Sequence, residues 1–164
     1  MVIIGIDPGL AHTGYGILRC GPGQPEILDT GVVSTKPGLS LEERLFKIHS
    51  SLDSIFQRFL PDVAVVEGLY AKNRNPEAAI LMGHARGVVL LLSAARGIPV
   101  KTYSPAKIKR SLTGNGNCSK KQVQRMVKMN LNLERDPSPD HIADALAAGL
   151  CHIWCARAEE LVKG

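Results

Sequence analysis

The sequence predicts an α/β fold in which one mixed, five-stranded sheet is flanked by helices on both faces. Short apolar, β-branched segments and helical repeats follow one another in the order β-β-β-α-β-α-β-α-α-α, which is typical of a mixed sheet covered by helices. A length of 164 residues with 45% apolar side chains suits one hydrophobic core, so we expect a single domain over residues 1–164. We find no internal repeat, linker or low-complexity tract that would divide the chain.

The first third of the chain predicts three antiparallel strands. Residues 2–6 are a continuous apolar run that ends at Asp7-Pro8-Gly9, so we expect a buried strand that carries a carboxylate at its tip. Residues 15–19 and 26–34 are two further strand candidates. The Gly- and Pro-rich connection between them predicts a hairpin.

The middle of the chain alternates helices and strands. A capping box at residues 40–43, followed by apolar residues every three or four positions, predicts an amphipathic helix. Residues 62–67 repeat the opening pattern, because an apolar strand again finishes on a carboxylate, here Glu67. A long helix over residues 76–96 and a strand over residues 98–103 then follow, as in a crossover between parallel strands.

The predicted helix over residues 76–96 is apolar nearly all round, and Gly83 and Gly87 lie four residues apart on it. Such a helix is either deeply buried or buries a second face against another subunit. His84 and Arg86 interrupt the apolar run, which argues against a membrane span. The apolar stretch at the N-terminus is too short for a signal sequence, so we expect a cytoplasmic protein.

The last third of the chain predicts three helices and carries most of the positive charge. The helices are expected over residues 105–112, 119–132 and 139–158, with a Gly-rich turn at residues 114–117. Residues 101–135 include nine basic side chains and one acidic side chain, although the whole chain has a net charge of only +5. This distribution is typical of a polyanion-binding protein, and a solvated basic face without a partner is the alternative.

Two carboxylates stand at the tips of strands that we expect to be parallel. Asp7 and Glu67 each follow a matched apolar run, so they should converge at one edge of the sheet. Neither has an obvious basic partner near it in the sequence, and a cluster of unpaired carboxylates is costly unless a cation neutralises it. Binding of a hard cation is the simplest explanation, whereas either carboxylate alone could equally cap the turn that follows it.

The last predicted helix adds further candidate ligands. His141 and Asp144 are three residues apart and therefore share a helix face, and the alanines around them permit close packing against the sheet. Asp140 lies one turn before Asp144. With Ser138 as the N-cap and Pro139 at the first helical position, Asp140 can also be an acidic first-turn residue that the helix dipole favours.

Five short motifs are spread along the chain in a fixed order. They are Ile4-Gly5-Ile6-Asp7-Pro8-Gly9, Val66-Glu67-Gly68-Leu69-Tyr70-Ala71-Lys72-Asn73, Gly83-His84-Ala85-Arg86-Gly87, Gly114-Asn115-Gly116 followed by Lys120-Lys121-Gln122-Val123, and His141-Ile142-Ala143-Asp144-Ala145-Leu146-Ala147. In this order the chain resembles the RuvC family of Holliday-junction resolvases over nearly its whole length. Asp-Pro-Gly after a strand also occurs in actin-like phosphotransferases, but those proteins usually need two such domains, and 164 residues supply one.

The resemblance implies an RNase H-like fold and a metal-dependent endonuclease that resolves four-way DNA junctions in recombination and repair. It implies paired symmetric nicks that leave 5′-phosphate and 3′-hydroxyl ends. By their positions in the motifs, the catalytic and metal-binding residues are Asp7, Glu67, His141 and Asp144, which would hold two Mg²⁺ ions per subunit, with Mn²⁺ as a substitute. Many family members have Asp where this chain has His141, so Asp140 remains a candidate to assist or replace it.

The resemblance also implies partners. It implies a homodimer formed through the long apolar helix, four-way junction DNA as substrate, and a branch-migration helicase complex. We expect DNA contacts from Tyr70, Lys72, Arg74, Lys107, Lys109, Lys120 and Lys121. A non-catalytic dimeric junction-binding module is the alternative function. The presence of Asp7, Glu67 and Asp144 argues against it, because such a module would not need a metal-binding cluster.

Overall fold

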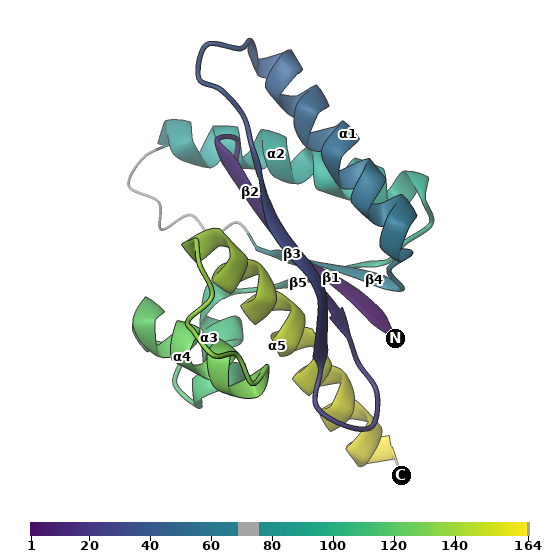
Figure 1. Cartoon of the computed structure of the whole chain (residues 1–164), viewed down its shortest axis with the longest axis vertical. Helices are drawn as coiled ribbons and strands as arrows, with labels where there is room; N and C mark the ends of the chain where they lie inside the picture. The colour runs from purple at the N-terminus through teal and green to yellow at the C-terminus, as the bar shows by residue number, and fades with distance from the viewer. Residues whose placement is uncertain (69–75, 164) are drawn as a thin grey trace.

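A computed structural model describes residues 1–68 and 76–163 of the chain (Figure 1). Its strands are β1 (Val2–Asp7), β2 (His12–Arg19), β3 (Glu26–Ser34), β4 (Val63–Glu67) and β5 (Val100–Tyr103). Its helices are α1 (Leu41–Phe59), α2 (Pro76–Ala95), α3 (Pro105–Thr113), α4 (Lys120–Asn130) and α5 (Asp140–Lys163). The predicted order of elements is therefore confirmed.

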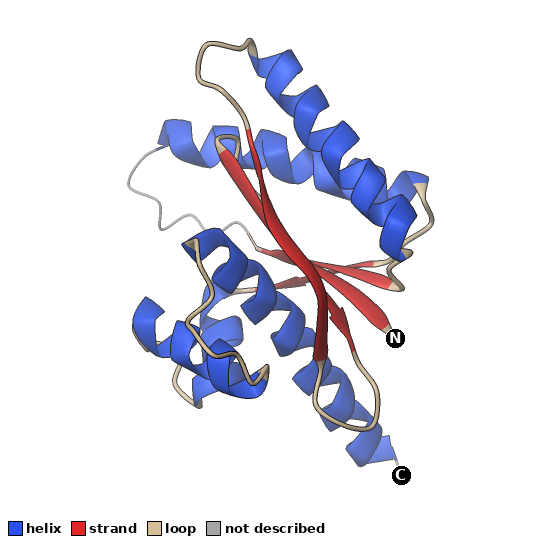
Figure 2. Ribbon diagram, in the orientation of Figure 1, coloured by secondary structure: helices blue, strands red, loops and turns tan. Residues whose placement is uncertain are grey.

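The five strands form one mixed sheet in the order β3-β2-β1-β4-β5. The first three strands pair antiparallel, while β4 pairs parallel with both β1 and β5. Helices α1 and α2 cover one face of the sheet, and α5 covers the other with α3 and α4 packed beside it (Figure 2). The predicted mixed sheet with helices on both faces is thus confirmed.

Each face of the sheet has its own hydrophobic core, because successive strand residues point to opposite faces. On β1, Ile3 packs with Leu146 and Leu150 of α5. The next residue, Ile4, packs with Phe56 of α1 and with the buried face of α2. All five of these apolar side chains are fully buried.

Several predicted boundaries differ from the structure; helix α5, for example, extends to Lys163 rather than to residue 158, and strand β5 begins at Val100 rather than at residue 98. Strand β2 begins at His12, whereas the sequence predicted a start at residue 15. The prediction started too late because Gly14 and Gly16 interrupt the apolar alternation by which a strand is recognised. Helix α5 begins at Asp140, so the prediction of Ser138 as N-cap and Pro139 as the first helical residue is wrong. Instead, the Pro139 carbonyl lies before the helix and accepts a hydrogen bond from the Ile142 N–H at 2.9 Å.

Helix α2 is buried on one side only. Val89 and Leu92 pack into the core, whereas Ile80 and Leu91 are 61% and 67% exposed, so deep burial within this chain is not the reason for its apolar character. Within the described residues, α2 is the one helix long and apolar enough to cross a membrane, and 22% of its most apolar stretch is buried. This is weak evidence for a span, because a helix that covers a sheet meets the same test.

Candidate active site

The carboxylates of Asp7 and Glu67 stand at neighbouring strand ends. Strands β1 and β4 are parallel, and Ile6 lies opposite Val66. The next residue on each strand is the carboxylate, so both side chains leave the sheet at the same edge. The predicted convergence of the two strand tips is confirmed.

Glycines allow the start of α5 to approach this edge closely. A Cβ atom at Gly5 of β1 would collide with the Ala145 carbonyl oxygen, and one at Gly14 of β2 would collide with the His141 carbonyl oxygen. The backbone of α5 therefore lies directly on the sheet, where side chains would normally separate the two layers. This contact places His141 and Asp144 above the strand ends.

His141 is hydrogen bonded to the first of the strand-tip carboxylates. Its Nδ1 lies 2.7 Å from Asp7 Oδ2, and the side chains of His141 and Asp7 are 39% and 20% exposed. Because a carboxylate only accepts, this contact assigns the imidazole proton to Nδ1. The lone pair of Nε2 is then available to a metal ion, an arrangement common among metal-binding histidines.

Lys120 lies between two carboxylates of α5. It is the first residue of α4, where the N-cap Ser119 fixes the helix start. Its Nζ lies 2.9 Å from Asp144 Oδ2 and 3.2 Å from Asp140 Oδ2. Gln124 donates a further hydrogen bond to Asp140 Oδ1 at 2.8 Å. The structure therefore turns Asp140 toward α4 and brings His141, not Asp140, to Asp7.

Burial and mutual repulsion perturb the acidic groups. Burial raises the pKa of Glu67 to about 7, with a further increase from the charges of Asp7 and Asp144. Burial likewise raises the pKa of Asp7, against the opposing effect of its hydrogen bond from His141. By contrast, the hydrogen bond and charge of Lys120 lower the pKa of the exposed Asp140. The cluster is thus crowded with negative charge that Lys120 only partly offsets.

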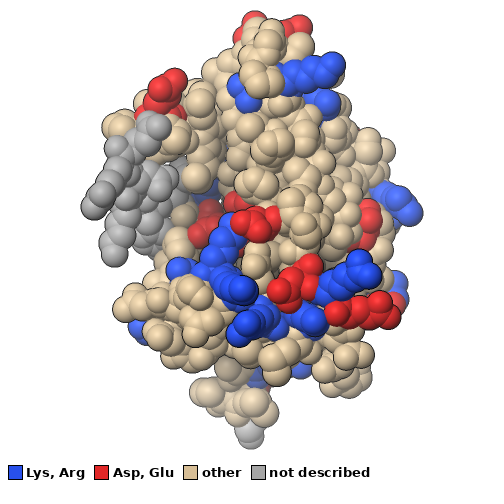
Figure 3. Space-filling model, turned by 60° about the vertical axis from the view of Figure 1, so that its left-hand side comes forward, with Lys and Arg blue, Asp and Glu red and all other residues tan. Residues whose placement is uncertain are grey.

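A cavity of about 260 Å³ opens beside this cluster, and we call it the lysine pocket. Its charged lining consists of Glu67, Asp144, Lys109 and Lys120, and apolar side chains of α3, α4 and α5 complete the wall. In Figure 3, acidic atoms lie directly next to a band of Lys and Arg side chains on this side of the molecule. A polyanion can therefore approach the carboxylates along a basic surface.

The donor set fits a hard divalent cation. Carboxylate oxygens with one imidazole nitrogen suit Mg²⁺ and Mn²⁺, and a bound cation would offset the burial and the neighbouring negative charges that raise the pKa of Glu67. In the part of the chain that the structure describes, no three of these side chains already converge on a single point. Asp144 is paired with Lys120 instead, so a bound metal would have to compete with that ammonium group.

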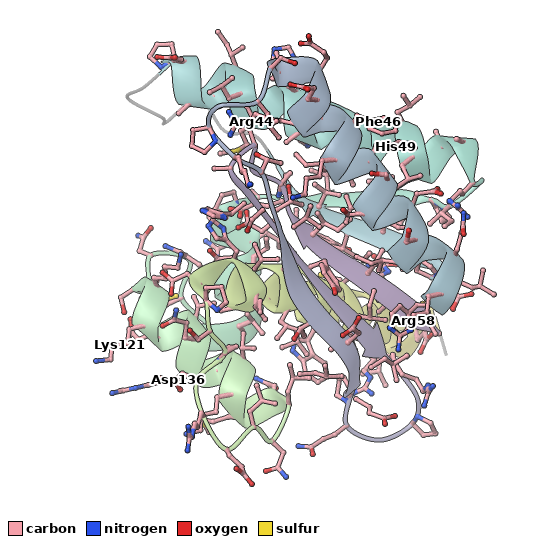
Figure 4. The ribbon with its side chains drawn as sticks, turned by 45° about the horizontal axis from the view of Figure 1, so that its top comes forward. Arg44, Phe46, His49, Arg58, Lys121 and Asp136 are labelled. Atoms are coloured by element: carbon pink, nitrogen blue, oxygen red, sulfur yellow. The ribbon has the colours of Figure 1, made fainter. Side chains whose placement is uncertain are left out.

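The predicted DNA-binding residues fall into three groups. Lys109 and Lys120 line the lysine pocket. Lys121 is exposed on α4 and points away from the molecule (Figure 4), and Lys107 lines a different cavity with Trp154 and Cys155. Tyr70, Lys72 and Arg74 lie outside the described residues.

The structure also brings residues to the site that the sequence interpretation missed. His12 lies with its ring centroid 5.6 Å from that of His141, and Gln124 holds Asp140. The sequence from His12 to Gly16 could have indicated this role for His12. If Gly14 and Gly16 are interpreted as positions of close packing, strand β2 extends back to His12, beside the carboxylates at the strand ends.

The comparison with protein families decides what this site belongs to. The family model for crossover junction endodeoxyribonuclease RuvC matches residues 3–152. The chain belongs to the RuvC family. It is therefore a crossover junction endodeoxyribonuclease with an RNase H-like fold, which agrees with the carboxylates at the strand ends.

Individual RuvC relatives match along most of their length. The RuvC of Rhodopirellula baltica is 44% identical over 155 residues, which cover 94% of this chain and 86% of the relative. That of Desulforamulus reducens is 43% identical over 152 residues, or 93% of each chain. A solved structure of Thermus thermophilus RuvC in complex with a Holliday junction substrate has a TM-score of 0.91 at 38% identity, covering 97% of this chain and 96% of that one.

A more distant solved structure shares the fold. The yeast mitochondrial Holliday junction resolvase has a TM-score of 0.64 at 16% identity, covering 96% of this chain and 82% of that one. At this level of identity, the likeness concerns the arrangement of the sheet and helices alone.

Proposed function

We propose that this chain, as a homodimer, cleaves four-way DNA junctions with two symmetric nicks, in recombination and DNA repair. The observation that carries the proposal is the meeting of Asp7, Glu67, His141 and Asp144 at one sheet edge, next to a pocket lined by lysines. The similarity to the Thermus thermophilus protein solved with a Holliday junction supports this choice of substrate.

The four residues at the sheet edge would hold two Mg²⁺ ions, with Mn²⁺ as a substitute. Bound divalent ions would lower the pKa of the attacking water and stabilise negative charge on the departing oxygen. Asp7 keeps the His141 proton on Nδ1 and so keeps Nε2 free as a ligand. Asp144 would serve as a ligand if its ion pair with Lys120 opened, and the ammonium group of Lys120 would then be available to a DNA phosphate.

Cleavage would be a direct hydrolysis of the phosphodiester. Water attacks phosphorus, the bond to the 3′ oxygen breaks, and the products carry a 5′-phosphate and a 3′-hydroxyl. No covalent enzyme intermediate is required, since the carboxylates of the site serve as ligands. Two ligatable nicks would restore two intact duplexes.

The lysine pocket would position the phosphates of the cleaved strand. Lys109 and Lys107 lie on the same helix, α3, but only Lys109 lines this pocket. Lys109→Ala should therefore weaken junction binding by about tenfold and flatten its salt dependence, because each phosphate contact contributes to the salt slope. Lys47→Ala, which removes an exposed lysine from α1 on the opposite face of the sheet, is the control and should leave both quantities close to wild type.

The outer face of α2 would form the dimer. Ile80, His84, Gly87 and Leu91 are exposed at helical spacing and form one stripe on this face. A two-fold axis through such a stripe would relate two nuclease sites, and a four-way junction is itself nearly two-fold symmetric. One site would then face each of the two strands to be cut.

Two further features follow from family membership and belong to the proposal. A branch-migration helicase complex would deliver the junction, and the protein would act in the cytoplasm. The alternative function, a dimeric junction-binding module without catalysis, would have no use for the perturbed carboxylates at the sheet edge.

The test is incubation of the protein with a synthetic four-way junction in Mg²⁺ and, in parallel, in chelator. We expect symmetric nicks with ligatable ends in Mg²⁺, binding without cleavage in chelator, and no cleavage of a linear duplex of the same sequence. Binding without cleavage under every metal condition would support the alternative. Cleavage that survives the chelator would contradict a metal-dependent site.

A further inference from the structure

A second cavity, of about 520 Å³, lies on the other side of the carboxylate cluster, and we call it the histidine pocket. Its polar lining consists of His12, Ser34, Ser138, Asp140 and His141. It joins the starts of β2 and α5 to the end of β3, whereas the lysine pocket lies beside α3 and α4. The carboxylate cluster therefore separates two cavities of different chemistry.

His12 is held in place within the histidine pocket. It pairs with Ser34 across β2 and β3, and its Nδ1 lies 3.0 Å from Ser34 Oγ. Its ring centroid is 5.6 Å from that of His141, with an angle of 35° between the rings. His12 is nevertheless exposed, so a ligand that reaches the carboxylates can also reach this imidazole.

Hydrogen-bond donors on either side of the carboxylate cluster can position the phosphates of a DNA strand that crosses it. On one side these are Lys109 and Lys120. On the other side, none of the described residues that line the histidine pocket is a lysine or an arginine, and its one carboxylate, Asp140, is already paired with Lys120 at 3.2 Å. His141 already directs its Nδ1 to Asp7, so His12 is the imidazole that remains to donate.

The Ser34 hydroxyl can donate to Nδ1 of His12 or accept from it, and the two cases place the ring proton on Nε2 or on Nδ1. When the Ser34 hydroxyl donates to Nδ1 of the neutral ring, the imidazole proton lies on Nε2. That N–H is a suitable donor to a phosphate oxygen, and a hydrogen bond to a charged acceptor is stronger than one between neutral groups.

We propose that His12 is a positioning residue that donates from Nε2 to a non-bridging oxygen of a phosphodiester flanking the scissile one. It would hold the cleaved strand on the side of the cluster opposite the lysines, while Ser34 fixes its tautomer. This assignment rests on the proposed junction cleavage at Asp7, Glu67, His141 and Asp144, and it adds a phosphate contact that those residues do not make.

The test replaces single phosphates by neutral methylphosphonates along the cleaved strand of a synthetic junction. With the wild-type protein, one flanking position should reduce binding in chelator by about tenfold, the loss expected for one hydrogen bond to a charged group. With His12→Ala, binding of the unmodified junction should be about tenfold weaker, and methylphosphonate at that same position should cost nothing further. His12→Ala combined with methylphosphonate at that position should therefore weaken binding by about tenfold in total. At every other position, the methylphosphonate should weaken binding equally for His12→Ala and for wild type.

Two further variants separate contact from folding. Ser34→Ala should give a smaller loss at the same phosphate, because the ring stays but its tautomer is no longer fixed. His49→Ala on α1 (Figure 4) is the matched histidine control and should leave the methylphosphonate profile unchanged. The thermal unfolding midpoint of each variant, compared with wild type, shows that the fold is intact.

The outcomes distinguish this inference from the proposed function. If His12→Ala and wild type give the same loss at every methylphosphonate, the phosphate contact is overturned, even though the wild type still cleaves junctions. If the wild type does not cleave junctions in Mg²⁺, the proposed function fails, and the assignment that rests on it is overturned as well.

Discussion

The two faces of the sheet are packed in different ways. On the α5 face, Gly5 and Gly14 let the helix backbone rest on the strands, and α3 and α4 cover its flank. On the α1 and α2 face, ordinary side chains such as Phe56 fill the space between layers, and the outer side of α2 exposes Ile80 and Leu91. The first face fixes the groups that we propose to be catalytic, whereas the second leaves an apolar surface exposed.

The two kinds of packing meet different requirements for the precise placement of side chains. A misplacement of about 1 Å can cost about 100-fold in rate, so ligands on a helix must be held against the strands that carry the other ligands. Backbone-to-backbone contact achieves this with little freedom of movement. An association surface has a looser requirement, because its affinity depends on buried apolar area.

The largest effect is expected from removing a strand-tip carboxylate. Asp7→Asn and Glu67→Gln should each reduce cleavage by more than about 100-fold, because even partners outside the ligand set cost 10 to 100-fold in metal sites. Binding of the junction should be unchanged or tighter, since a negative charge near DNA is removed. Single-turnover cleavage and equilibrium binding check this, and a variant that keeps more than about a tenth of the activity would remove that residue from the ligand set.

A second large effect should come from separating α5 from the sheet. Gly14→Ala places a methyl group against the His141 carbonyl oxygen and should destabilise the protein by about 1–3 kcal/mol, the usual cost of overpacking. Cleavage should fall more than junction binding, because His141 and Asp144 shift together. Gly38→Ala, which adds its methyl group to open space, is the control. Equal stability and activity in both variants would contradict the close docking of α5.

On the other face, a charge should break the dimer without harming the fold. Gly87 is exposed and has open space around it, so Gly87→Glu should form the α2 helix at least as well as glycine does. We expect a monomer in light scattering at micromolar concentration that has lost paired nicks. Gly87→Ala should remain dimeric. A wild-type protein that is itself monomeric at this concentration would show that the stripe on α2 has another role.

The smallest effect concerns stability and pH. The pKa of Glu67, raised by burial to about 7 from an ordinary value of 4.5, means that its ionisation opposes folding. This penalty is absent below pH 4.5, grows as the pH rises and is complete above about pH 7. Without metal, Glu67→Gln should therefore melt about 2–4 °C higher than wild type near pH 8, as expected for ~1 kcal/mol, with a smaller difference near pH 5. Thermal melts at the two pH values check this, and a gain that is larger near pH 5 would contradict the sign.

The strand tips could be predicted from the sequence because they depend on local patterns. The apolar runs before Asp7 and Glu67 define two strands, and parallel pairing brings their ends together whatever lies between them. The capping box at the start of α1 was predictable for the same reason, since Ser40 and Glu43 are three residues apart.

The contacts that complete the site could not be predicted, because they join residues far apart in the chain. The ring of His12 meets that of His141 only when β2 and α5 dock through Gly14. The pairing of Lys120 with Asp140 and Asp144 likewise depends on how α4 packs against α5. The exposure of one side of α2 could not be predicted either, since composition does not show which apolar face of a helix packs against the sheet.

The most direct test of the two faces acting together is cleavage of a supercoiled plasmid cruciform by a heterodimer of wild-type and Asp7→Asn subunits. Purification through two different tags would isolate this species. Wild-type homodimers should linearise the plasmid, whereas heterodimers should stop at the nicked circle because each site cuts one strand. Asp7→Asn homodimers should leave the plasmid supercoiled. Heterodimers that linearise the plasmid as fast as wild type would contradict the assignment of one site to each strand.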